Sequence, residues 1–211
     1  MTHLENDKNK SIRLASDRTV DSLQRVYAIV IALALTIAVK LLIESVGIIP
    51  HEGVSKPNSN SLPTILLFVA FLSTLIVFYH GMNRHLDDTF VIGTKVDPRR
   101  LPLLVDIVVF LLEGGLLVVM ASTINNPKVF LVAWSILLCV DIVWGLFVYF
   151  SLKRKAPIKW VFNNLLFLIF AWFFWRVVFP QNAILIAVIE ILRSGIDYKL
   201  NWNFYFPREN S

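Results

Sequence analysis

Six apolar stretches occupy most of this 211-residue chain, and short polar segments separate them. Within a lipid bilayer every backbone polar group needs an internal partner, so long apolar stretches of this kind fold as helices. A helix needs about 20 residues to cross the hydrocarbon core. The sequence therefore predicts an all-α polytopic membrane protein with six transmembrane helices. The expected helices cover about residues 26–49, 62–82, 101–122, 128–152, 160–179 and 183–198.

Basic residues are concentrated on one side of the predicted bundle. Of the 20 Lys and Arg residues, 16 fall in the N-terminal segment, the second and fourth connections and the C-terminal segment. The outer connections contain only Lys56 and Lys128, while Lys40 and Arg176 lie within predicted helices. Cytoplasmic connections carry the excess of Lys and Arg in membrane proteins. We therefore expect both termini in the cytoplasm and a location in a bacterial inner (plasma) membrane.

The charge pattern also divides the chain into three parts. These are a cytoplasmic N-terminal segment at 1–25, a transmembrane bundle at 26–198 and a cytoplasmic tail at 199–211. Residues 1–18 are expected to be disordered, with helix starting near Thr19, and residues 83–100 to form a basic connection. Glu190 and Arg193 interrupt the sixth apolar stretch, so a second interpretation has five spans and an amphipathic last helix in the membrane interface.

Composition argues against several classes of function. Hydrophobic residues make up 56% of the chain and charged residues 17%, and the net charge of +5 belongs mostly to the predicted cytoplasmic side. Such a basic side meets anionic lipid headgroups, so nucleic-acid binding is not favoured. The single Cys139 offers no disulfide and no cysteine metal site. His80 and His85 do not share a helix face, and no catalytic motif is present. We expect no enzyme, catalytic residue, cofactor or metal site.

Four acidic residues well inside the predicted membrane helices are candidates for an ion pathway. They are Asp106, Glu113, Asp141 and Glu190. Ionisable groups are costly within a bilayer and are candidates for function. Asp106 and Glu113 are seven residues apart, so they share one face of their helix. The acids favour a cation pathway or a proton relay, and the alternative is that they only neutralise Lys40, Arg193 or helix ends.

Other polar residues in the helices predict contacts between helices or with the interface. Lys40 and Glu44 form a pair one turn apart, with Glu44 as a candidate charge at an outer mouth. Asn163 and Asn164 are expected to form hydrogen bonds between helices. Gly114-Gly115 allows close approach of a neighbouring helix or a kink. An interfacial aromatic belt is expected; its members are Trp160, Trp172, Trp175, Trp202, Tyr198 and Tyr205.

The first predicted helix carries a candidate gate. Ile29, Leu33 and Thr36 repeat at helical spacing, and small Ala28 and Ala32 lie beside them. Apolar constrictions close a pore by expelling water. The stripe therefore predicts either a hydrophobic gate in a central pore or a narrow packing face.

Parts of the first three helices resemble a known channel family. The relevant pieces are Arg25-Val-Tyr-Ala-Ile, the segment FLSTLIVFYHGMNRHLDDTF at 71–90, and LPLLVDIVVFLL at 101–112. Together they are similar in layout to the six-helix endolysosomal and bacterial potassium channel family. This resemblance implies an oligomer whose first helix lines a hydrophobic constriction. The Phe-Ser-Asp triplet of that family is replaced here by Leu23-Gln24-Arg25, so the resemblance does not extend to potassium selectivity.

The expected function is a homo-oligomeric ion channel, with a tetramer as one arrangement, that conducts monovalent cations. A cytoplasmic anionic signal or partner protein could open it, as in membrane effectors of anti-phage defence. A second hypothesis is a cation- or proton-coupled small-molecule transporter that uses Glu113, Asp141 and Glu190. A third is a non-conducting membrane scaffold or partner subunit. The expected partners are the lipid bilayer and further copies of the chain.

Overall fold

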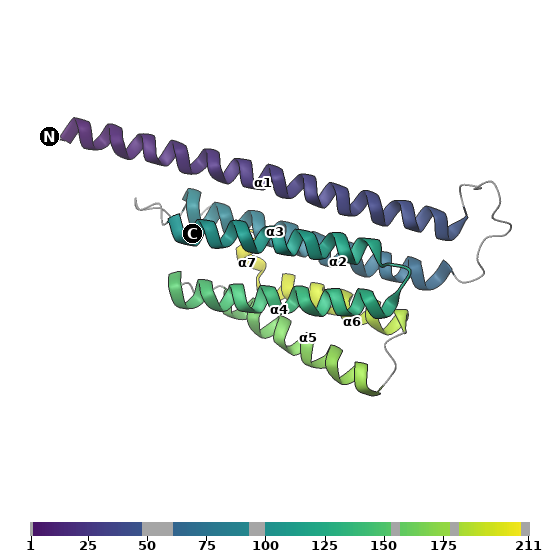
Figure 1. The fold of residues 1–211 in the computed structure, drawn as a ribbon. Coiled ribbons are helices and arrows are strands. Elements are labelled where there is room, and N and C mark those ends of the chain that lie inside the picture. Colours follow the sequence, from purple (N-terminus) through teal and green to yellow (C-terminus); the bar gives the residue numbers. More distant parts are fainter. Residues whose placement is uncertain (1, 48–60, 93–99, 153–156, 178–181, 208–211) are drawn as a thin grey trace.

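The computed structural model describes residues 2–47, 61–92, 100–152, 157–177 and 182–207. Every regular element within these ranges is a helix. In chain order they are α1 (Thr2–Val46), α2 (Ser61–Leu86), the π-helical η1 (Asp87–Ile92), α3 (Arg100–Ser122), α4 (Pro127–Leu152), α5 (Pro157–Val177), α6 (Ala183–Leu200) and α7 (Trp202–Tyr205). The six long helices alternate in direction, so α1 begins and α6 ends at the same end of the bundle, called the terminal end below (Figure 1).

Four of these helices are long and apolar enough to cross a membrane. The suitable segments are Asp17–Val46, Ser61–Val91, Pro102–Ser122 and Pro127–Ser151. The prediction of an all-α protein is thus confirmed for the described residues, and four of its helices are suited to crossing a membrane. The two remaining long helices differ in composition. The apolar part of α5 is the shorter Ile158–Phe173, and the 18-residue α6 contains four charged residues.

The N-terminal segment departs from expectation. Residues 1–18 were predicted to be disordered, but α1 is continuous from Thr2 to Val46 and extends well past the other helices at the terminal end (Figure 1). No Gly or Pro interrupts residues 2–46, so nothing in the sequence breaks the helix once the apolar part has formed. The helix ends where Gly47 adopts a positive φ of 73°, a conformation that glycine adopts at little cost.

The second predicted connection is also more helical than expected. It was predicted at 83–100, but α2 continues to Leu86 and η1 to Ile92. Leu86 and Phe90 are both buried. The inward-facing side of the helix therefore continues beyond its predicted end. Several predicted segments lie outside the described residues. These are 50–60 of the first outer loop, 93–99, 153–156 of the fourth connection, and the turn at Pro180-Gln181.

Helix ends elsewhere agree with local capping chemistry. Pro127 occupies the first turn of α4, where a missing backbone N–H costs nothing, and Asn126 Oδ1 accepts a hydrogen bond from the Val129 amide at 3.3 Å. The α6 helix starts in the same way, because Asn182 Oδ1 accepts from the Leu185 amide at 3.2 Å. An N-terminal asparagine cap is typically worth about 1 kcal/mol.

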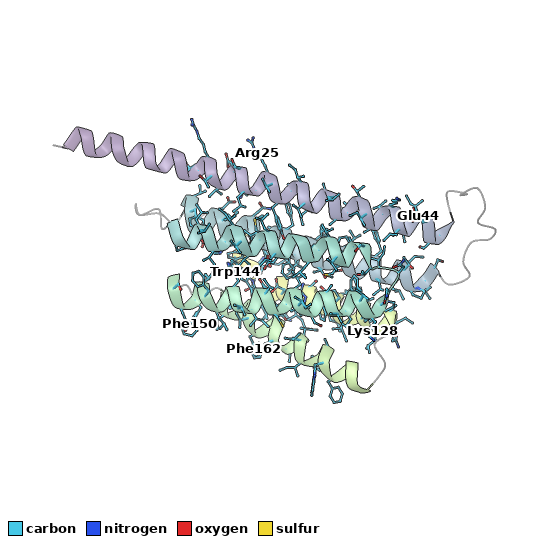
Figure 2. All side chains as sticks on the ribbon, viewed as in Figure 1. Arg25, Glu44, Lys128, Trp144, Phe150 and Phe162 are labelled. Carbon is cyan, nitrogen blue, oxygen red and sulfur yellow. The ribbon has the colours of Figure 1, made fainter. Side chains whose placement is uncertain are left out.

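The helices form layers around a shared core. The α1 helix packs along α3 and α2, α6 packs on α2, and α4 lies between α3 and α5. Figure 1 shows α5 diverging from α4 toward the end opposite the termini. Large side chains from α2, α3 and α4 are fully buried between the layers, including Phe71, Phe110, Phe130 and Trp134. Apolar side chains such as Phe150 and Phe162 point outward (Figure 2), as expected for helices that meet lipid.

The predicted aromatic belt is partly wrong. Trp172 and Trp202 are exposed, but Trp160 and Tyr205 are buried. Trp160 stacks on Trp144 with ring centres 6.1 Å apart. These two side chains therefore belong to the interior of the bundle. The side chain of Trp175 lies outside the described residues.

Candidate functional site

A buried cluster of charged and polar side chains lies between α2, α4, α5 and α6. It is called the acid cluster here. Its members are Thr74 of α2, Asp141 of α4, Asn163 and Asn164 of α5, and Glu190, Arg193, Ser194 and Asp197 of α6. Except for Asp141, which is partly exposed, these residues are buried. The α6 residues are spaced three and four apart, so they form one stripe that faces the bundle.

Arg193 is the central cation of the acid cluster. Its guanidinium nitrogens Nε and Nη2 both lie 3.2 Å from Glu190 Oε1. Its Nη1 donates a hydrogen bond to Asn164 Oδ1 at 3.0 Å. The guanidinium also lies 5.4 Å from the centre of the Phe78 ring, a favourable position for a cation over an aromatic face. One buried cation thus joins three helices.

Glu190 is held from two sides. The Thr74 hydroxyl donates to Glu190 Oε1 at 2.5 Å, and the Ser194 hydroxyl lies 3.4 Å from the same oxygen. Hydrogen bonds to an ionised group are the stronger kind, contributing roughly 1.5–3 kcal/mol. Thr74 of α2, Ser194 of α6 and Arg193 therefore all contact Oε1 of Glu190, while the buried Oε2 has no hydrogen-bond partner among the described residues.

The two asparagines of α5 confirm the prediction of hydrogen bonds between helices. The Asn163 side chain donates to the Arg193 carbonyl at 3.3 Å. The Asn164 amide donates to Asp141 of α4 while its carbonyl accepts from Arg193. Asn164 consequently bridges a carboxyl group on α4 and the guanidinium on α6.

Asp197 forms the part of the acid cluster nearest the terminal end. The Tyr205 hydroxyl donates to Asp197 Oδ2 at 2.5 Å, and the Asn201 amide donates to Asp197 Oδ1 at 3.2 Å. Glu190 and Asp197 are seven residues apart, which is about 10 Å along a helix. The polar groups thus extend for at least two helical turns along the bundle.

A small cavity joins these groups to Glu113 of α3. Its volume is about 30 Å³, enough for one or two water molecules. The charged groups that line it are Glu113, Asp141, Asp197 and Arg193. Glu113 is buried, and its Oε1 has no hydrogen-bond partner among the described residues. A buried polar atom of this kind beside a polar cavity is where a water molecule, a proton or an ion is expected.

A second buried cluster lies on the α3 side of the cavity, toward the terminal end. Asp106 accepts a hydrogen bond from Trp144 Nε1 at 2.8 Å through one oxygen and contacts His85 Nε2 at 3.1 Å through the other. The His85 and Trp144 rings meet edge to face with centres 4.6 Å apart. Phe110 packs against both rings. Trp144 and Phe110 also line the cavity, so these two rings separate the His85–Asp106 pair from the acid cluster.

The structure brings together four of the eight candidate pathway residues. Asp106, Glu113, Asp141 and Glu190 all lie in the two polar clusters or at the cavity. The other four, Ile29, Leu33, Thr36 and Glu44, lie on the exposed face of α1. Ile29 is 68% exposed and Leu33 is 53% exposed. The predicted gate residues thus line no passage within a single chain.

Glu44 and Lys40 form the predicted pair, with 3.9 Å between Oε1 and Nζ. This pair lies at the end opposite the termini, as the label of Glu44 in Figure 2 shows. Exposed pairs of this kind contribute at most about 1 kcal/mol. Because of its position at that end, the pair is remote from the acid cluster.

Several important residues were not selected from the sequence. Arg193 was counted with the cytoplasmic basic residues, but it is buried inside the bundle. The spacing Glu190, Arg193, Ser194 and Asp197 on one helix face was the available signal. His85 was considered only beside His80 as a metal ligand, but its side chain turns to Asp106. No sequence signal indicated that Tyr205 folds back onto Asp197.

Comparison of the chain with protein-family models, characterised proteins and solved structures finds no match. The resemblance to the potassium channel family therefore stays a prediction. What the protein does has to be argued from the two polar clusters and the cavity.

Proposed function

We propose that this protein is an integral membrane protein of six spanning helices that transfers protons across the bilayer through the acid cluster. Both termini are proposed to lie in the cytoplasm, as the distribution of basic residues predicts. The observation that carries the proposal is the water-sized cavity lined by Glu113, Asp141, Asp197 and a single Arg193. Of the alternatives drawn from the sequence, this is closest to the proton-coupled transporter.

The burial pattern of α6 favours a spanning helix over an interfacial one. Three of its four charged residues, Glu190, Arg193 and Asp197, are buried, and the fourth, Lys199, is exposed in the last turn. Apolar side chains are exposed instead, namely Ile184, Val188, Ile191, Leu192 and Ile196. An interfacial helix presents its polar face to water, and α6 does the opposite. Its 18 residues extend for about 27 Å, and the 21 residues of α5 for about 31 Å. Both lengths are close to the thickness of the hydrocarbon core.

The imbalance of charge explains why the acid cluster would bind protons. Arg193 neutralises Glu190, with which it forms an ion pair. Glu113, Asp141 and Asp197 have no second buried Lys or Arg beside them in the cavity lining. An uncompensated buried carboxylate costs several kcal/mol, so these groups need a proton or a small cation to remain inside the bundle. Groups that gain and lose such a proton can pass it on.

The size and layout of the cavity favour a proton over larger cargo. Sites for organic molecules usually measure roughly 300–1,000 Å³, about ten times the volume found here. No group of three His, Cys, Asp or Glu residues within the described ranges is arranged to hold a metal ion. The carboxyl groups are distributed along the bundle and are bridged by Asn164 and Arg193. Such a row suits stepwise proton transfer through carboxyl groups and water.

A second candidate is the homo-oligomeric cation channel predicted from the sequence. The observation that favours it is the exposed apolar stripe of Val26, Ile29 and Leu33 on α1, which further copies of the chain could cover around a pore. Lipid covers apolar surfaces of this kind equally well. Unitary currents through planar bilayers would distinguish a pore, because a carboxyl relay turns over without resolved openings.

The proposal is tested with purified protein in liposomes that contain a pH-sensitive dye. A potassium gradient with valinomycin supplies the driving voltage, and the initial rate of internal pH change is recorded. We expect Glu113→Gln and Asp141→Asn to reduce proton flux by about 100-fold, because a positioned proton carrier typically contributes a factor of this order. Glu44→Gln is the matched control and should retain the wild-type rate, since Glu44 lies outside the acid cluster.

Two outcomes would contradict the proposal. One is a wild-type protein that moves no protons above empty liposomes. The other is a flux that survives in both Glu113→Gln and Asp141→Asn. If the wild-type protein moves sodium or potassium but no protons, and both variants lose this flux, then the same site carries a monovalent cation instead of a proton.

A further inference from the structure

We propose that Tyr205 closes the acid cluster at the terminal end and is the residue through which protons enter and leave there. This inference rests on the proposed function for its biological meaning, but the closure itself is a structural claim that can be tested without proton transport. Its basis is the segment 201–207, which follows α6, turns back on the bundle, and places one tyrosine against the cavity.

The backbone of this segment is anchored to α6. The Asn201 amide nitrogen donates to the Asp197 carbonyl at 3.0 Å, and the Asn201 side chain donates to the same carbonyl at 3.2 Å. The α7 turn follows directly, so the chain reverses within a few residues. This reversal brings Tyr205 back beside Asp197, eight residues earlier in the sequence.

Tyr205 fills the terminal end of the cavity. It is buried, it lines the cavity together with Asp197 and Met82, and its hydroxyl donates to Asp197. Gly81 of α2 makes this position available, because a Cβ atom there would lie 3.4 Å from the Tyr205 hydroxyl oxygen. That distance is an ordinary van der Waals contact, so a Cβ atom would just touch the hydroxyl and a side chain larger than alanine at position 81 would press on the ring.

The surroundings of Tyr205 hold α7 in place from two more helices. The Arg84 Nε atom donates to the Phe204 carbonyl at 3.0 Å. The Trp160 ring meets the Phe204 ring edge to face with centres 4.7 Å apart. The His80 ring lies 4.8 Å from the Tyr205 ring. Helices α2, α5 and α6 therefore all contribute to the closed position.

The segment is nevertheless small enough to move. The α7 helix has four residues. Its residues Trp202 and Asn203 are exposed, and so are Phe206 and Pro207, which follow it. Only Phe204 and Tyr205 connect the turn to the bundle through the contacts described above, so its outward movement is a local opening of one short segment. Outward movement of Tyr205 would break its hydrogen bond and expose Asp197 to water. In the closed position, the phenol hydroxyl is the group between Asp197 and the terminal end.

The test measures access to the cavity with a cysteine reporter. Met82→Cys is placed in a Cys139→Ser background, so that the reporter is the only thiol. The protein is held in nanodiscs, where both faces are accessible, and the rate of labelling by a charged, membrane-impermeant thiol reagent is recorded. Tyr205→Ala should raise this rate by at least about tenfold, and Tyr205→Phe by a smaller factor, because the hydrogen bond contributes only part of the closing free energy.

Two controls separate gating from damage to the fold. Trp202→Ala removes an exposed aromatic side chain from the same turn and should leave the labelling rate unchanged. A second reporter, Leu117→Cys, is fully buried on α3 and should stay slow to label in every variant. An unchanged rate at Met82→Cys in Tyr205→Ala would overturn the inference. Fast labelling of Leu117→Cys in the same variant would also overturn it, because Tyr205 would then be a structural residue of the bundle.

The labelling result and the flux result are independent. If Tyr205→Ala opens the cavity but Glu113→Gln leaves proton flux unchanged, Tyr205 is a closure of a cavity that does not carry protons. If proton flux depends on Glu113 but Tyr205→Ala leaves the labelling rate unchanged, protons enter the cavity elsewhere. In that case the inference about Tyr205 fails while the proposed function stands.

Discussion

The ion pair between Glu190 and Arg193 makes a quantitative prediction about stability. In Arg193→Met, Glu190 loses its counter-ion while Asp141 and Asp197, which also interact with Arg193, lose their nearest cation. Removing one partner of a buried pair usually costs about 3–5 kcal/mol. We therefore expect Arg193→Met to lower the free energy of unfolding by about that amount. Glu190→Leu should cost less, because Arg193 keeps Asn164 and the other two acids as neighbours.

The double variant Glu190→Leu/Arg193→Met should recover part of the stability that Arg193→Met loses. Both charges are then absent, and apolar replacements of buried pairs are often close to neutral. Thr74 keeps its hydrogen bond to the Ala70 carbonyl at 3.2 Å, but Asn164 Oδ1 loses the guanidinium donor. An unsatisfied buried acceptor costs about 1–3 kcal/mol, and Asp141 and Asp197 still lack their nearest cation. The double variant should therefore remain less stable than the wild type by at least that amount.

The measurement is equilibrium unfolding in mixed micelles of a mild detergent and dodecyl sulfate, followed by tryptophan fluorescence. The three variants and the wild type form a double-mutant cycle that isolates the coupling between the two side chains. A loss below about 1 kcal/mol for Arg193→Met, the value of an exposed pair, would refute the reasoning. So would a double variant whose loss equals the sum of the single losses.

Three further predictions concern α1, α3 and the orientation of the bundle. Gly114→Ala should destabilise the protein by about 1–3 kcal/mol, because its new Cβ would lie 2.8 Å from Val30 Cγ1. Gly115→Ala should be nearly neutral, because a Cβ there contacts nothing within 4 Å. Thermal unfolding compares the two variants, and equal losses of stability would contradict the close packing of α1 on α3. If an oligomer forms a pore lined by α1, Leu33→Ser and Ile29→Ser should give leaky or constitutively conducting protein in planar bilayers. Unchanged currents at matched membrane abundance would show that α1 lines no pore. In a Cys139→Ser background, Trp202→Cys should react with an impermeant reagent only from the cytoplasmic side and Asn126→Cys only from the outside, and the reverse pattern would overturn the proposed orientation.

Local sequence patterns were enough to predict the helices and much of their orientation. Apolar length predicts which stretches of the chain can cross a bilayer, and the distribution of Lys and Arg predicts which connections share a side. Helical periodicity correctly placed Asp106 and Glu113 on one buried face of α3. The same periodicity places Glu190, Arg193 and Asp197 on one face of α6, because residues three, four and seven apart are neighbours on any helix.

Which residues meet across helices was decided only by the tertiary structure. Asp106 was expected to belong with Glu113 to an ion pathway, but packing of α2 and α4 against α3 brings His85 and Trp144 to its two oxygens. Thr74 and Glu190 are 116 residues apart in sequence, and Tyr205 reaches Asp197 only because the chain reverses after α6. Periodicity relates residues within one helix, whereas the rotation and depth of one helix against another follow from the packing of all their side chains together. Helical periodicity in the sequence therefore indicated most of the acids that face inward, although Asp197 was missed. The tertiary structure decided that Asp141, Glu190 and Asp197 surround one arginine, while Asp106 pairs with His85.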